Sequence, residues 1–135
     1  MTFTADQLAL KAHIEAKNAE TQAWVDAAPG RWAMMPVSDP AHWAEYGIFT
    51  VEQYEHDAAA STVYDMTKET FGYKPSWDAL MNMTIEELHA EIDRIARVIK
   101  MDAQRETDEH ERAIKACMDA GAPDRATAER WLNQA

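Results

Sequence analysis

The sequence predicts an all-α protein, a helical bundle of four to five helices organised on one long helix over about residues 84–120. Three observations support this fold class. Apolar residues recur at steps of three and four, and no segment alternates as a strand would. Thr4, Thr50 and Thr84 are each followed three residues later by Gln or Glu, the capping-box pattern of a helix start. The four glycines all stand where a helix would end.

The long helix is predicted from the longest run without Pro or Gly. A capping box of Thr84 and Glu87 opens it, and Gly121 followed by Pro123 closes it. One apolar stripe lies on its first half and should be the centre of the core, formed by Ile85, Leu88, Ile92, Ile95 and Ile99.

The stripe is interrupted after Ile99 by polar residues and resumes only at Ile114. A single helix of this length would span roughly 55 Å, longer than a compact domain of this size is wide. It therefore either protrudes or breaks near residues 104–111. A continuous or slightly kinked helix is favoured, because no Gly or Pro lies in that stretch.

The first predicted helix runs from Thr4 to Ala28, where Pro29-Gly30 stops it. Its apolar face is expected to contain Leu8, Ala12, Ile14, Ala19, Trp24 and Val25. Residues 31–39 have no period but are too apolar for a solvated loop, so they are expected to lie against the core or a partner.

The shorter segments carry the same helix start and stop residues. Ser38 and Asp39, before Pro40, are the predicted N-cap and N1 pair of a short helix that ends at Gly47, and a longer helix runs from Thr50 to Phe71. A short segment follows Ser76, and Asp124 can cap a last helix.

Composition indicates a single domain over residues 1–135, large enough to bury a core without disulfides or a structural metal. Lys and Arg number 13 against 24 Asp and Glu, a net charge of −11 that repels nucleic-acid phosphates and favours basic protein surfaces. Cys117 is the only cysteine, so no intramolecular disulfide is possible. No signal peptide or bilayer-spanning window is recognisable. We expect a cytoplasmic protein that binds neither membrane nor nucleic acid directly.

No constellation typical of an enzyme is present. The chain has no Gly-rich phosphate loop, no paired cysteines and no Ser motif on a strand-to-helix elbow, so neither catalysis nor a cofactor is predicted. Glu86-x-x-His89 matches one part of a di-iron bundle site, but the preceding helix adds only fragments, namely Glu52, Glu55 and His56.

Two stretches are candidate partner-binding surfaces. The first is the acidic run, here Asp102, Glu106, Glu109 and Glu111. Its first interpretation is an exposed, salt-bridged helix face, and the alternative is a contact surface for a basic partner. The second is the apolar segment with Trp32, Met34 and Met35.

The stretch YDMTKETFGYKP at residues 64–75, followed by MTIEEL at 83–88, resembles small uncharacterised proteins of tailed bacteriophages. The resemblance is confined to residues 64–88 and implies no reaction. Lys74 stands where that pattern more often has Arg, so no guanidinium contact is carried over.

The leading hypothesis is therefore a non-enzymatic, phage-type binding protein in the host cytoplasm. It would engage a host protein with a basic surface and inhibit a defence or nucleic-acid enzyme. One alternative is a structural or assembly protein that self-associates through the long helix. The other is a small metalloenzyme built on Glu86 and His89.

Overall fold

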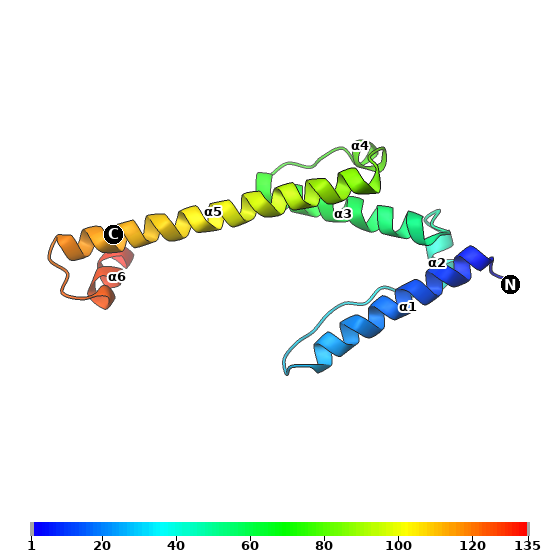
Figure 1. Cartoon of the computed structure of the whole chain (residues 1–135), viewed down its shortest axis with the longest axis horizontal. Coiled ribbons are helices and arrows are strands. Elements are labelled where there is room, and N and C mark those ends of the chain that lie inside the picture. Colours follow the sequence, from blue (N-terminus) through cyan, green and yellow to red (C-terminus); the bar gives the residue numbers. More distant parts are fainter. Residues whose placement is uncertain (1, 135) are drawn as a thin grey trace.

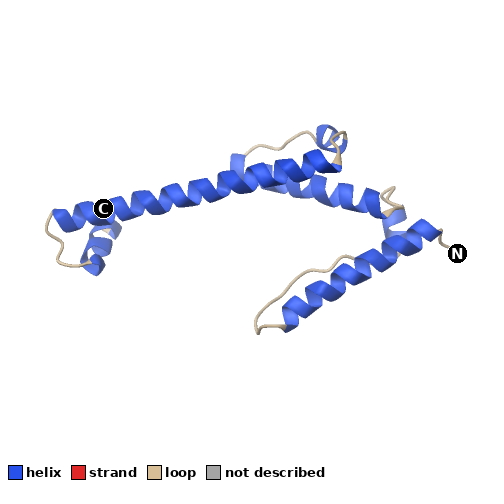
Figure 2. Ribbon diagram, in the orientation of Figure 1, coloured by secondary structure: helices blue, strands red, loops and turns tan. Residues whose placement is uncertain are grey.

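The computed structural model describes residues 2–134, which contain six helices and no strand (Figure 2). The helices are α1 (Ala5–Asp26), α2 (Pro40–Ala44), α3 (Val51–Phe71), α4 (Trp77–Met81), α5 (Ile85–Asp119) and α6 (Arg125–Asn133). The all-α prediction is confirmed. The number exceeds the expected four to five by α4, a helix of five residues that the sequence indicated only as a short segment after Ser76.

The predicted helix starts are confirmed by their hydrogen bonds. In each capping box the Thr hydroxyl accepts from the backbone N–H three residues on, at 3.1 Å for Thr4, Thr50 and Thr84. Gly72 ends α3 in the left-handed conformation, with φ of 77°. The first helix is slightly shorter than predicted and ends at Asp26.

The helices form an open, elongated molecule (Figure 1). α3 and α5 lie side by side and run in the same direction, because the connection through α4 returns from the end of α3 to the start of α5. α1 meets α3 near one end and diverges from it, while α6 folds back against the far end of α5. α5 therefore bridges two otherwise separate parts of the fold.

Three separate clusters replace the single core expected from the composition. The middle cluster joins α3, α4 and α5 and contains Ala59, Ala60, Val63, Leu80, Leu88 and Ile95. The N-terminal cluster contains Leu10, Ile14 and Ile48, with Trp43 and Tyr54 packed against it. The C-terminal cluster contains Ile114, Ala122 and Ala128, with Cys117 and Leu132 against it.

The long helix is continuous, as favoured from the sequence. α5 has 35 residues and passes through 104–111 without a break, which makes it about 52 Å long at 1.5 Å per residue. The predicted stripe lies in the middle cluster as far as Ile95, but Ile99 is 45% exposed. Every residue from 99 to 112 is exposed, because this stretch lies between the regions that α3 and α6 cover.

The predicted apolar face of α1 is wrong in part. Leu10 and Ile14 are the buried residues of this helix, whereas Leu8 and Trp24 are about half exposed. The reason is that α1 meets the rest of the fold only near its first half, while a strap of residues 27–39 runs back along its second half (Figure 1).

The strap does not lie against the core. It is held to α1 by the side chain of Asn18, which donates to the Pro36 carbonyl at 2.9 Å, and by Arg31, which donates to the Trp24 carbonyl at 2.9 Å. Trp32 is 77% and Met34 80% exposed. Backbone connectivity and polar contacts position this apolar segment without burying its largest side chains.

The open arrangement leaves much more surface than a chain of this size needs to expose. The accessible surface is 9569 Å² for a mass of 15.3 kDa, whereas a compact monomer of that mass exposes about 7,100 Å². The excess is about a third of the compact value.

Candidate functional site

The acidic run lies on the uncovered middle of α5, but its members differ. Glu106 and Glu109 have no ion-pair partner among residues 2–134, and Asp102 lies 3.6 Å from Arg105. Glu111 is instead engaged within the fold: Arg125 donates to it through both terminal nitrogens, at 2.8 and 2.6 Å.

The Arg125 contact assigns Glu111 a structural role. The hydrogen bonds from Arg125 hold the pKa of Glu111 below its ordinary value. Arg125 also donates through Nε to Glu129 at 3.0 Å, so one guanidinium joins α5 to the first turns of α6. The two partners are 14 residues apart, and no local pattern in the sequence signals their pairing.

The second candidate surface, the apolar segment with Trp32, Met34 and Met35, lies on the strap. A shallow hollow of about 390 Å³ is lined by Met34, Met35, Pro36, Val37, His42 and Trp43. The indole N–H of Trp43 donates to the Val37 carbonyl at 2.7 Å and so fixes the strap beside α2. Met35 is half-buried in this hollow, while Trp32 projects from the strap.

The two candidate surfaces are not brought together. The strap lies beside α1 in one arm of the molecule, and the middle of α5 lies in the other (Figure 1). A partner contacting one would meet the other only by spanning both arms.

Glu86 and His89 are both exposed on the first turns of α5. Within residues 2–134, no group of three or more His, Cys, Asp or Glu side chains is placed to hold a metal ion. Nor does any described helix combine the length and apolar character needed to cross a bilayer.

A polar joint ties α1 to α3. Glu55 accepts from His13 and, at 2.9 Å, from Lys17, beside the N-terminal cluster. Partial burial works to raise the pKa of Glu55, but the hydrogen bonds and charges of His13 and Lys17 outweigh it and hold the pKa below 4.5. Burial is also the main reason that the pKa of neighbouring Tyr54 is raised, with the Glu55 charge adding to it.

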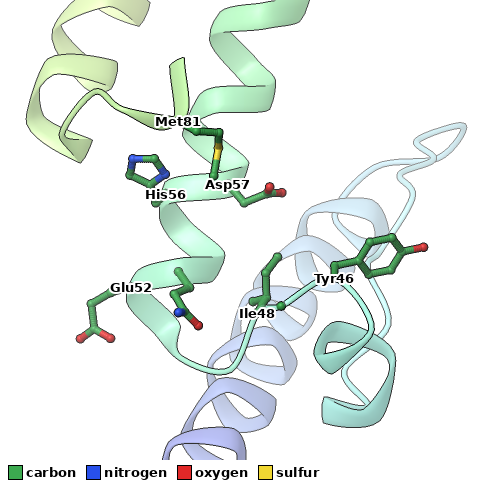
Figure 3. Close-up of a pocket in the computed structure, with 8 residues that line it drawn as sticks. Tyr46, Ile48, Glu52, His56, Asp57 and Met81 are labelled. Carbon is green, nitrogen blue, oxygen red and sulfur yellow. The ribbon is translucent and has the colours of Figure 1, made fainter. Parts of the chain in front are cut away.

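A pocket at the start of α3 was not predicted from the sequence. This α3 pocket has a volume of about 390 Å³ and is lined by Tyr46, Gly47, Ile48, Glu52, Gln53, His56, Asp57 and Met81. Figure 3 shows where the lining side chains come from: Glu52, His56 and Asp57 from α3, Met81 from α4, and Ile48 and Tyr46 from the segment after α2. The carboxylates of Glu52 and Asp57 point to opposite sides of α3, and the ring of Tyr46 points away from the pocket.

The pocket exists because α4 and α5 do not cover the first turns of α3. His56 lies 2.6 Å from the carbonyl of Met83, just before α5 begins, so α4 and α5 cover α3 only from this level onward. The first two turns of α3 are left open on the same side. Gly47, in the left-handed conformation with φ of 73°, turns the chain so that Ile48 reaches the N-terminal cluster.

The polar groups of the α3 pocket are mainly hydrogen-bond acceptors. Since the Met83 carbonyl can only accept, the His56 Nε2 carries the proton and donates, which leaves Nδ1 as the acceptor in the neutral ring. Glu52 and Asp57 add two carboxylates. Gln53 Oε1 is already used, because it accepts from the N–H groups of Phe49 at 2.7 Å and Thr50 at 3.2 Å.

The lining of the pocket contains two carboxylates and one His side chain, and no Ser, Thr or Cys side chain. Glu52 and His56 were visible in the sequence only as fragments of a metal pattern, and Glu55 between them turns to α1 instead. What identifies the pocket is the meeting of three segments, which no local signal predicts.

Comparison of the chain with protein-family models, with curated proteins and with solved structures found no match. The resemblance to tailed-bacteriophage proteins therefore stays a prediction.

Proposed function

We propose that the chain is a non-enzymatic binding protein that engages a protein partner with a basic surface. The observation that carries this proposal is the extra accessible surface of the open fold. The excess over a compact monomer is about 2,400 Å², more than the roughly 800 Å² that each partner contributes to a standard interface. A partner that covers part of this surface would supply burial that the three small clusters lack.

The charge distribution favours a basic partner. The net charge is −11, and Asp102, Glu106 and Glu109 lie on a stretch of α5 that no other helix covers. Such charges accelerate encounter with a positively charged surface and add less to the lifetime of the complex. The exposed side chains of Trp32 and Met34 on the strap would supply the apolar anchors that slow dissociation.

The resemblance over residues 64–88 extends the proposal to a host protein. Enzymes that bind nucleic acid present basic surfaces to the phosphate backbone. An acidic protein that covers such a surface competes with the nucleic acid, so inhibition of a defence or nucleic-acid enzyme is the outcome we propose.

Self-association is the second candidate, and the uncovered stretch of α5 favours it. Ile99 continues the apolar stripe beyond the end of α3 and is 45% exposed. A second copy could cover it, although the charge of −11 on each chain opposes such a dimer. Sedimentation velocity decides this point: a species at 15.3 kDa across the concentration range would rule self-association out.

The main test is capture of a partner on the immobilised chain from a bacterial lysate, at two salt concentrations. Glu106→Lys should reduce capture and its salt dependence. Asp108→Lys is the matched control, because it makes the same charge change two residues away, on the opposite side of the helix. Capture that neither variant affects would place the contact elsewhere, and the absence of any captured protein would contradict the proposal.

A further inference from the structure

We propose that Glu55 fixes the angle between an N-terminal arm, residues 4–48, and α3, and that loss of its charge lets this arm turn as a unit about its junction with α3. The inference goes beyond the proposed function and does not depend on it. It rests on three observations. The arm is held together by its own contacts, the chain passes from the arm into α3 without a separate loop, and the polar contacts across the junction converge on Glu55.

The N-terminal arm buries its apolar residues against itself. Leu10 and Ile14 of α1 are fully buried and pack with Ile48 and Trp43, and all four residues precede α3. The Trp43 indole N–H donates to the Val37 carbonyl at 2.7 Å, and the Ile48 N–H donates to the Trp43 carbonyl at 3.1 Å. α1, the strap and α2 are therefore one unit, which keeps its own contacts when its orientation to α3 changes.

The arm and α3 meet at one point of the chain. Ile48 belongs to the N-terminal cluster, whereas the next residue, Phe49, is already part of the start of α3, because its N–H donates to Gln53 Oε1 at 2.7 Å. Gly47 turns the chain just before this point, with φ of 73°. Changes in a few backbone angles at residues 47–50 therefore suffice to reorient the arm, as in other hinges.

The polar contacts across the junction converge on Glu55. Among residues 2–134, the hydrogen bonds and ion pairs that join the arm to α3–α6 are those that Glu55 accepts from His13 and, at 2.9 Å, from Lys17. The two donors are four residues apart and lie on the same face of α1. Two attachments at different levels of α1 oppose rotation of the arm, which a single attachment would allow.

The apolar contact across the junction opposes rotation less. From α3, the half-buried Tyr54 packs against the N-terminal cluster, with its ring 5.0 Å from that of Trp43 and 6.1 Å from that of His13, both edge to face. Apolar burial is non-directional, whereas a hydrogen bond weakens steeply when its angle departs from linear. Without the Glu55 charge, Tyr54 still joins the arm to α3, but the contacts that fix the angle are weakened.

The test measures this angle by double electron–electron resonance between two nitroxide labels on the full chain. Ala23→Cys near the end of α1 and Glu69→Cys near the end of α3 place the labels at exposed positions, and Cys117→Ser removes the native thiol. The labelled parent should give one narrow distance distribution. Glu55→Gln should add further distances, because exchanging a charge-assisted for a neutral hydrogen bond shifts an equilibrium on the order of tenfold.

Two variants make the result specific. Glu52→Gln is the matched control: it removes the same charge about one turn earlier on α3, from an exposed position, and should leave the distribution unchanged. Lys17→Gln removes one of the two donors without altering α3 and should broaden the distribution as Glu55→Gln does. Circular dichroism verifies the helix content of each variant. If Glu55→Gln loses helix, the Lys17→Gln result decides.

Three results would overturn the inference. These are a broad distribution in the labelled parent, an unchanged distribution in the variant that decides, or equal broadening by Glu52→Gln. Broadening that is confined to the variants of the Glu55 contact supports it. The strap, which is part of the arm, would then have an adjustable distance from the acidic run on α5.

Discussion

Truncation of Ile95 tests how much of the fold depends on the middle cluster. Ile95 is fully buried between α3 and α5, and Ile95→Ala removes three carbon atoms. At about 0.8 kcal/mol per methylene, the lost burial amounts to roughly 2.4 kcal/mol. The cavity adds on the order of 1 kcal/mol to this cost, and the higher helix propensity of Ala lowers the cost by roughly a few tenths of a kcal/mol. We therefore expect a destabilisation of about 3 kcal/mol.

Ile99→Ala is the matched control, since it makes the same deletion one turn further along α5. Ile99 is 45% exposed, so about half of the transfer term is lost and solvent fills the space. The expected cost is about 0.5–1 kcal/mol once helix propensity is included.

Urea unfolding followed by circular dichroism at 222 nm measures both variants against the wild type. Equal losses of stability would contradict the placement of Ile95 in the core. A large effect of Ile99→Ala alone would show that Ile99 is covered, as it would be in a self-associated chain.

Three further predictions follow from other parts of the fold. Gly72→Val should cost about 1–2 kcal/mol, because φ is 77° while nothing lies within 4 Å of an added Cβ, so backbone strain alone opposes it. Gly72→Asn, which tolerates this conformation better, should cost less, and equal midpoints for both variants and wild type would mean that the left-handed turn is absent. The lowered pKa of Glu55 means that its stabilising contribution is complete above pH 4.5 and is lost as the pH falls below that value. Glu55→Gln should flatten this acid limb in pH-dependent unfolding, and an unchanged limb would show that the joint with His13 and Lys17 is not formed. Small-angle X-ray scattering should give a radius of gyration well above the ~14 Å of a compact domain of this length, because α5 alone is about 52 Å long. A value near 14 Å would contradict the open arrangement of α1 and α6.

The helix starts were accessible to sequence reasoning because their signals are local. The hydroxyls of Thr4, Thr50 and Thr84 bond to groups three residues away, so the pattern in the chain and the contact in the fold are nearly the same thing. The same holds for the end of α3, where the conformation of Gly72 depends on its own backbone.

Burial depends on which surfaces meet, so the spacing of apolar residues predicted it less well than it predicted the helices. Ile95 and Ile99 belong to one stripe, yet only Ile95 has α3 beside it. In α1 the buried pair is Leu10 and Ile14, because the apolar contacts with neighbouring segments lie in the first half of the helix. The spacing of apolar residues defines a face but not how far along the helix that face is covered.

The candidate surfaces show the same division. The charge of −11, the all-α class and the acidic stretch of α5 follow from composition and local pattern, so they can be predicted from the sequence. Three features cannot: Glu111 is bound by Arg125, the strap and the acidic run lie in different arms, and Glu52, His56 and Asp57 line a pocket with Met81. Each of those facts joins segments far apart in the chain, and their meeting is set by the packing of whole helices rather than by any residue and its neighbours.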